Sequence, residues 1–219
     1  MSASHHPSDE LLLDYASGAL GEAWSFAIAT HIALCPTCRR TVARMEALGG
    51  VTLDASDAEP LAAGSFDAVL ARLDTPLDEN QPSTVEQALD DAPVLPQPLR
   101  HYLGADVDDL KWQRLGMGAY QLLIPTGEEG VTARLLRIPA GRPVPEHSHG
   151  GMELTLVLAG AFADTTGTYG RGDLQEADET LQHQPHAAPE EDCICLAITD
   201  APLRFKSLPA RLVQPFLGI

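Results

Sequence analysis

The sequence is poor in basic residues, in cysteine and in long apolar segments. Its 14 Lys and Arg residues stand against 31 Asp and Glu residues, which gives a formal net charge of −17. Such an acidic chain is repelled by the phosphates of nucleic acids and of anionic membranes, so we expect neither as a partner. The charge favours a basic protein partner, and that attraction should weaken as salt rises.

No apolar run approaches the length of a membrane-spanning helix, and no basic N-terminal region precedes a hydrophobic segment. We therefore expect a cytoplasmic protein without membrane contact. The four cysteines form two close pairs, Cys35 with Cys38 and Cys193 with Cys195. These spacings favour metal binding or burial in a strand over a disulfide framework.

The pattern of the chain changes twice, which predicts two domains and a linker. Residues 1–75 have helical periodicity apart from an acidic stretch at residues 51–60, residues 76–98 are acidic and rich in proline, and residues 99–219 alternate short apolar stretches with glycine. Many short strands at close intervals indicate an antiparallel sandwich or barrel. The predicted fold is therefore α+β multidomain, with a small helical bundle followed by an antiparallel β-barrel.

Four helices are expected in the first part. The first spans residues 10–16, with Ser8 as its N-cap and Gly18 as its end. The second spans residues 22–34, and the third starts at Pro36 and ends at Gly49 and Gly50. An amphipathic helix over residues 65–73 either packs on the first three or clasps a partner, and its periodicity does not separate these alternatives.

Six strands are expected in the last part, at residues 120–124, 131–138, 154–158, 193–199, 203–205 and 212–217. In the fourth of these segments, Cys193 and Cys195 share one face of a strand. Adjacent thiols on one strand close a disulfide only with strain, so core packing is favoured and redox sensing is the second interpretation.

His31, Cys35 and Cys38 have the spacing of metal ligands. A histidine four residues before a cysteine lies on the same helical face, and Pro36 suits the first turn of a new helix that carries Cys38 beside Cys35. His5 or His6 can supply the fourth ligand of a tetrahedral zinc site. Helices this short bury little, so zinc would provide much of their stability. The alternative is a buried thiol pair with a surface histidine.

A second constellation lies in the β part, as Gly141-x5-His147-Ser148-His149-x3-Glu153-x6-Gly160. Residues two apart on a strand face the same way, so His147 and His149 should point together into the barrel. A turn at Gly150 and Gly151 would return Glu153 beside them, and either His183 or His186 would add a third imidazole. Such a set suits zinc, iron, manganese or nickel. Surface loop histidines are the alternative.

The two constellations resemble known families. The first resembles the zinc-binding anti-sigma domain, whose signature matches His31, Cys35 and Cys38, with the earlier histidine in an N-terminal His-His pair where register favours His6. The second resembles the cupin motif, whose metal ligands map onto His147, His149, Glu153 and His183. Together they are similar to the ChrR-type anti-sigma factors over essentially the whole chain.

This resemblance implies a function. The N-terminal domain would hold an extracytoplasmic-function sigma factor inactive in the cytoplasm by covering its polymerase-binding surfaces. The cupin half, with zinc or another divalent transition metal, would be needed for release by an oxidative signal such as singlet oxygen or an organic peroxide. We therefore expect a regulator rather than an enzyme, and no catalytic residue.

Two other functions fit parts of the sequence. A metal-dependent cupin enzyme, a dioxygenase or isomerase, would use the second constellation, with the zinc domain as an accessory. A zinc-finger DNA binder would use Arg39, Arg40 and Arg44, but these arginines more often form a solvated or salt-bridging face. The acidic residues of the same half also disfavour DNA.

Overall fold

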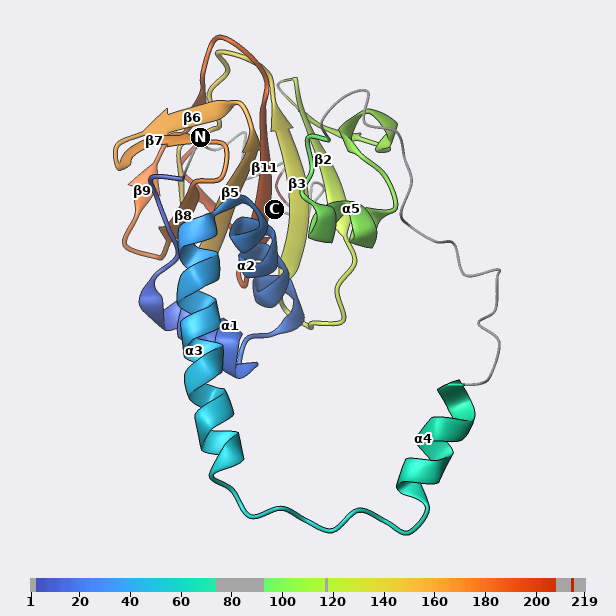
Figure 1. Cartoon of the computed structure of the whole chain (residues 1–219). Helices are drawn as coiled ribbons and strands as arrows, with labels where there is room; N and C mark the ends of the chain where they lie inside the picture. The colour runs from blue at the N-terminus through green and yellow to red at the C-terminus, as the bar shows by residue number, and fades with distance from the viewer. Residues whose placement is uncertain (1–2, 74–92, 117, 208–213, 215–219) are drawn as a thin grey trace. The chain divides into compact units, whose positions relative to one another are not determined.

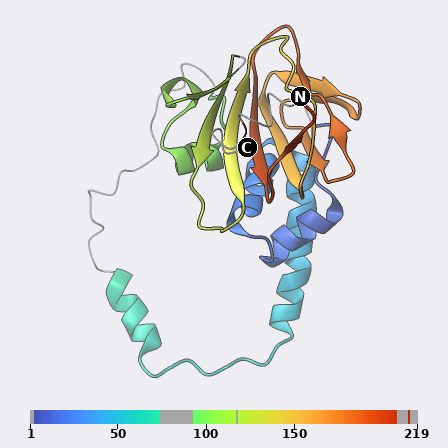
Figure 2. The same ribbon diagram turned by 180° about the vertical axis from the view of Figure 1, so that it is seen from behind.

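The computed structural model describes residues 3–73, 93–116, 118–207 and 214, and all structural statements concern these residues. The chain forms two compact units, one of residues Met1–Ala47 with Pro93–Ile219 and one of residues Leu48–Ala92. Figures 1 and 2 show the chain from opposite sides. In the described part of the chain, no helix is both long and apolar enough to cross a bilayer.

Helices occupy the first part of the chain, as predicted. They are α1 (Asp9–Ser17), α2 (Glu22–Leu34), α3 (Pro36–Asp54) and α4 (Ser65–Leu73), followed later by α5 (Gln97–Leu103) and a 3-10 turn at Val107–Asp109. The predicted caps of α1 are confirmed. The Ser8 hydroxyl accepts a hydrogen bond from the backbone N–H of Leu11, and Gly18 ends the helix with a φ of 72°, which favours glycine.

The predicted end of α3 was wrong. The helix passes through Gly49 and Gly50 and ends at Asp54. Neither glycine adopts a positive φ. Glycine inside a helix costs only about 1 kcal/mol relative to alanine, so two glycines weaken a helix without ending it.

The β domain consists of short antiparallel strands. They are β1 (Gln113–Gly116), β2 (Ala119–Ile124), β3 (Thr132–Ile138), β4 (His147–Ser148), β5 (Glu153–Ala159), β6 (Ala161–Asp164), β7 (Gly167–Gly170), β8 (Leu174–Ala177), β9 (Gln182–His183), β10 (His186–Ala187), β11 (Cys193–Thr199) and β12 (Arg204–Phe205). Five predicted segments correspond to β2, β3, β5, β11 and β12. The sixth, residues 212–217, lies outside the described residues except for Gln214.

The strands form three sheets. The large sheet has the order β1-β2-β3-β11-β5-β8, and the small ones have the orders β10-β6-β7 and β12-β4-β9. The predicted antiparallel β fold is therefore confirmed. In the pairing of the described strands the large sheet is open, with β1 and β8 at its edges, rather than closed into one barrel.

The two faces of the large sheet have different neighbours. On one face, Leu154, Leu156 and Leu196 share a fully buried core with Ile28 of α2, which lies across β5 and β11 (Figure 1). On the opposite face, Cys195 belongs to a second buried cluster with residues of β6 and β7. Because side chains alternate along a strand, one sheet supports both the helices and the interior of the β domain.

A pair of glutamates joins α2 to the loop between β2 and β3. Glu128 accepts a hydrogen bond from the Ala23 N–H at 3.0 Å, and Glu22 accepts one from the Gly127 N–H at 2.6 Å. Gly21 leaves room for this contact, since a Cβ at this position would clash with the carboxylate of Glu128. The first turn of α2 is thus capped by a residue more than a hundred positions away.

Order in the β part begins before the predicted end of the linker. Leu95 and Leu99 are fully buried, and the carboxylate of Asp106 accepts hydrogen bonds from the N–H groups of Val94 and Leu95, both at 3.0 Å. Helix α5, which starts at Gln97, contacts α2. The predicted division into domains of residues 1–75 and 99–219 with a linker at residues 76–98 remains a prediction.

Candidate metal centres

Four side chains from the helical part converge on one point. The ligand atoms of His6, His31, Cys35 and Cys38 all lie within 4.8 Å of one another, and the last three residues are buried. The Nδ1 atom of His6 lies 3.4 Å from the sulfur of Cys35 and 3.4 Å from that of Cys38. The structure therefore brings together all four residues predicted for the first centre.

The joint between α2 and α3 places three of these side chains. His31 lies in the last turn of α2, and the Cys35 N–H donates to its carbonyl oxygen at 2.8 Å. Cys35 itself is extended, with φ −109° and ψ 102°, because a residue before proline avoids the helical region. Pro36 then starts α3 at once, which turns Cys38 back toward Cys35.

His5 and His6 have separate surroundings. The ring of His5 packs against Tyr169 at an interplanar angle of 38° with centroids 4.3 Å apart, and its Nδ1 lies 3.5 Å from a carboxylate oxygen of Asp173. Only His6 of the pair faces the two thiols. The geometry thus agrees with the choice of His6 over His5.

The chemistry of this cluster fits a bound cation. Burial, together with the nearby His6, lowers the pKa of His31 to about 4, so its ring is neutral. Neither of its ring nitrogens forms a hydrogen bond of ordinary geometry with a described residue. Burial and the neighbouring Cys35 raise the pKa of Cys38 to about 12. Two imidazoles and two thiols with unused lone pairs are a donor set typical of zinc.

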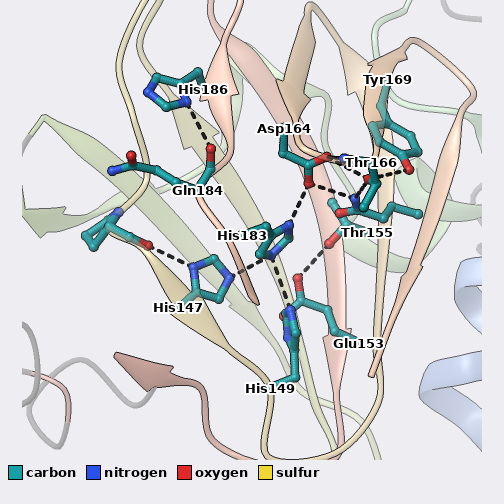
Figure 3. A network of polar contacts seen from close by, with 12 residues as sticks. His147, His149, Glu153, Thr155, Asp164, Thr166, Tyr169, His183, Gln184 and His186 are labelled. Atoms are coloured by element: carbon teal, nitrogen blue, oxygen red, sulfur yellow. Dashed lines mark hydrogen bonds and ion pairs between the residues drawn. The ribbon is translucent and has the colours of Figure 1, made fainter. Parts of the chain in front are cut away.

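Three histidines meet in the β domain (Figure 3). Strands β4 and β9 pair so that His147 lies opposite His183, and His149 follows directly after β4. The Nε2 atom of His183 lies 3.1 Å from that of His147 and 3.2 Å from that of His149. His147, His149 and His183 are all buried.

Neighbouring oxygens orient two of these rings. The Nδ1–H of His147 donates to the carbonyl oxygen of Pro145 at 2.8 Å, and that of His183 donates to Asp164 at 2.6 Å. With Nδ1 carrying the proton, each Nε2 presents a lone pair to the same point. Converging lone pairs fit a metal ion. The carbonyl and carboxylate groups that orient the two rings are the partners that metal-binding histidines usually have.

Glu153 stands beside this triad rather than inside it. One carboxylate oxygen lies 3.5 Å from Nδ1 of His149, and the other accepts a hydrogen bond from the Thr155 hydroxyl at 2.8 Å. The group whose ligand atoms lie within 4.8 Å of one another comprises the three histidines without Glu153. His186, the alternative to His183, is exposed and contacts the carbonyl oxygen of Gln184.

Asp164 is a site residue that the sequence analysis missed. Burial acts in the opposite direction, but hydrogen bonds from Thr166, Gln175 and His183 lower the pKa of its carboxyl to about 2. It is therefore ionised and holds the imidazole of His183 (Figure 3). No local pattern marks its role in the site, because Gln175 and His183 lie on β8 and β9.

A large cavity opens beside the triad. Its volume is about 1220 Å³, and its lining includes His147, His183, Glu153, Cys193 and Cys195. The sulfurs of Cys193 and Cys195 lie 3.4 Å apart, on the face predicted for them. A hydrogen bond from the Cys195 thiol to Cys193, together with burial, raises the pKa of Cys195, so this thiol is protonated at neutral pH.

Comparison with known proteins connects the two centres to one family. Residues 101–201 match the sequence profile of the ChrR cupin-like domain. The chain is also 46% identical to the anti-sigma-E factor ChrR of Cereibacter sphaeroides, over 219 residues that cover 100% of both chains. The chain belongs to the ChrR family.

A solved ChrR structure supports this assignment. The crystal structure of Rhodobacter sphaeroides SigE in complex with the anti-sigma ChrR contains a chain that is 44% identical to this one. The TM-score is 0.78, and the match covers 90% of this chain and 98% of that chain. In this ChrR-family protein the histidine triad lies inside the matched cupin-like region, and the thiol centre lies before it.

The two centres should make the metal-free protein sensitive to acid. Burial lowers the pKa of both His31 and His147 from 6.5 to about 4. Between these values the unfolded chain binds more protons than the folded one, so the free energy of unfolding falls as pH drops from about 6.5 to about 4. Each histidine contributes a slope of up to ~1.4 kcal/mol per pH unit.

Urea unfolding of the chelated protein at several pH values in this window measures the slope. A His31→Gln, His147→Gln variant should show a shallower dependence than the parent. Equal slopes for parent and variant would contradict the assignment of these two rings as buried neutral imidazoles.

Proposed function

We propose that this protein is an anti-sigma factor that binds an extracytoplasmic-function sigma factor and withholds it from RNA polymerase. Release would follow an oxidative signal such as singlet oxygen or an organic peroxide. The similarity to ChrR along the full length carries the proposal, since a chain of the same fold was solved in complex with SigE. The net charge of −17 suits a sigma factor, whose nucleic-acid-binding faces are basic.

The exposed apolar side chains of residues 48–73 support a protein partner. On α4, Phe66 is 68% exposed and Leu73 is 74% exposed, and no residue of this helix is buried. Leu48, Val51 and Leu53 add exposed apolar side chains toward the end of α3. Of the two interpretations of the amphipathic helix, these exposures favour the one in which it clasps a partner.

We assign a metal to each centre. Zinc would bind His6, His31, Cys35 and Cys38. It would thereby crosslink the segment before α1 to the joint of α2 and α3. Zinc or another divalent transition metal would bind the histidine triad, and Glu153, whose carboxylate lies 3.5 Å from Nδ1 of His149, would become the fourth ligand by turning toward the triad. When bound there, zinc would supply a ligand-binding centre, and a redox-active metal would also supply an oxidant-sensitive one, inside a fold that would close as a barrel.

The proposal includes a cytoplasmic location and no direct contact with nucleic acid or membrane. Arg39, Arg40 and Arg44 are exposed on α3, but they lie on a strongly acidic chain. The first two contact the Ile32 carbonyl oxygen and the Thr37 hydroxyl of the same helical region. A partner carboxylate is therefore a better match for this stripe than a DNA phosphate.

A metal-dependent enzyme is the second candidate. The cavity of about 1220 Å³ beside the triad is large enough for a substrate, which favours a dioxygenase or isomerase. Turnover of an oxygen-consuming or carbonyl substrate by the metal-loaded protein, together with failure to bind any sigma factor, would place this candidate first.

The direct test is binding of the full chain to an extracytoplasmic-function sigma factor from the same genome. Size-exclusion chromatography and calorimetry should show a 1:1 complex, and the principal sigma factor serves as the control that does not bind. A His147→Ala, His183→Ala variant should bind equally well but should no longer release the sigma factor on oxidant exposure. Normal release from that variant would separate the triad from signalling.

A further inference from the structure

The N-terminal segment runs along the outer edge of β8. The backbone N–H groups of Ser4 and His5 donate to one carboxylate oxygen of Asp173, at 2.5 and 2.9 Å. The N–H of Leu174 donates to the carbonyl oxygen of His5 at 3.2 Å. Because β8 is an edge strand, these contacts occupy hydrogen-bonding groups that would otherwise face solvent.

Asp173 is built into the β domain as a fixed anchor. It is 6% exposed, and its second oxygen accepts a hydrogen bond from the Gly170 N–H at 2.8 Å. Its own backbone carbonyl accepts from Val157 of β5 at 3.0 Å. Burial alone would favour the neutral acid, but the backbone N–H donors keep the pKa of this carboxyl below its ordinary value. The anchor is therefore a buried, ionised carboxylate that holds backbone groups.

This anchor sets the position of a metal ligand. His6 follows directly after the anchored residues, whereas His31, Cys35 and Cys38 belong to the α2–α3 joint. His6 is also the exposed member of the four, so little packing holds its ring in place. Its position relative to the thiols therefore depends on where the turn before β8 holds Ser4 and His5.

The same turn is connected to the histidine triad. Gln175, two residues after Asp173, donates a hydrogen bond to Asp164 at 2.8 Å. Asp164 in turn accepts the Nδ1–H of His183 at 2.6 Å (Figure 3). Gln175 and Asp173 are both buried. Side-chain hydrogen bonds from His183 through Asp164 to Gln175, the backbone from Gln175 to Asp173, and the hydrogen bonds of Asp173 thus form a continuous path to the segment that carries His6.

The geometry points to Asp173 as a positioning residue that couples the two metal centres. It holds His6 against the thiols of the helical centre, and it receives any shift of β8 that follows a change at His183. This inference rests on the proposed metal centres and adds the link between them. Allosteric coupling of this kind is reciprocal, so the occupancy of either centre should affect the other.

The first test measures how fast zinc leaves the helical centre of the full-length protein. Transfer to a chromogenic chelator, with mass-spectrometric mapping of Cys35 and Cys38 alkylation, follows this centre separately from Cys193. Asp173→Ala should lower the zinc affinity about tenfold to a hundredfold, as removal of the outer partners of metal ligands does, and should speed release accordingly. Asp173→Asn, which keeps one acceptor oxygen, should have a smaller effect and serves if the alanine variant does not fold.

Asp192→Ala is the matched control. This carboxylate also accepts a backbone N–H, that of Ala140, and pairs with Arg137, but its contacts all lie within the β domain. It should leave the zinc release rate unchanged. A release rate for Asp173→Ala equal to that of the wild type, or an equal rise in both variants, would overturn the inference.

The second test measures coupling directly. His183→Ala should change zinc release from the helical centre, and this change should vanish in the Asp173→Ala background. Independent, multiplicative effects of the two substitutions would refute the coupling. If Cys35→Ser leaves zinc content unchanged, the proposed helical centre itself has failed. If it removes zinc while Asp173→Ala has no effect, only the present inference has failed.

Discussion

Replacing Cys35 and Cys38 together by serine should remove one equivalent of zinc and unfold α1 and α3 while α2 stays folded. Few apolar side chains hold the outer helices: α1 buries Leu12, and α3 buries Val42 besides Cys38. Burying one such side chain contributes about 1.5–3 kcal/mol. A structural zinc contributes on the order of 10 kcal/mol in zinc-finger peptides, so the metal dominates here.

Helix α2 differs because Ala23, Ala27 and Ile28 are fully buried in the core shared with the large sheet. Hydrogen exchange should therefore become fast in residues 9–17 and 36–47 and stay slow in residues 22–34. The affinity for the sigma factor should fall by at least about a hundredfold, since zinc binding and folding of such helices are one event.

A Cys193→Ser, Cys195→Ser variant provides the matched control for thiol loss. It should keep the helical zinc, the exchange pattern and the sigma affinity. Slow exchange across α1 and α3 in the Cys35→Ser, Cys38→Ser variant would show that the helices do not depend on the metal.

The second large effect is expected on α4. A Phe66→Asp, Leu70→Asp variant should weaken sigma binding by about a hundredfold or more, because apolar anchors at interfaces are worth about 2 kcal/mol or more each. The stability of the free protein should not change, because these side chains are 68% and 44% exposed. Calorimetric titration and thermal unfolding measure the two quantities separately.

Leu123→Asp is a suitable comparison, since Leu123 of β2 is also an exposed leucine, at 46%. It should leave the affinity for the sigma factor unchanged. Equal affinities for the α4 variant and the wild type would exclude α4 from the interface.

Local signals explain which elements the sequence predicted. Ser8, Gly18 and Pro36 act on their own neighbours, so the starts of the helices and the joint at Cys35 followed directly. Long apolar strands such as β3, β5 and β11 were predicted for the same reason. Strands β9 and β10 were missed, because each has only two residues and exists through its pairing with a distant segment.

The sites follow the same division. His31, Cys35 and Cys38 lie within one helical joint, and the spacing alone predicted their meeting. The spacing left His183 and His186 equivalent, and the pairing of β4 with β9 separates them. Asp164 and Asp173 carry no local signal. Asp173 contacts Ser4 and His5 across almost the entire chain, so only the tertiary structure shows it.

The exchange of glutamates between α2 and the β2–β3 loop has a practical consequence for dissecting this protein. An excised fragment of residues 1–75 lacks Glu128, so the Ala23 N–H in the first turn of α2 would lose its hydrogen-bond acceptor. Glu22 would likewise lose the Gly127 amide. A fragment and the full chain therefore differ in how the N-terminus of α2 is capped. Replacing Gly21 by an acidic N-cap residue would restore an acceptor in the fragment.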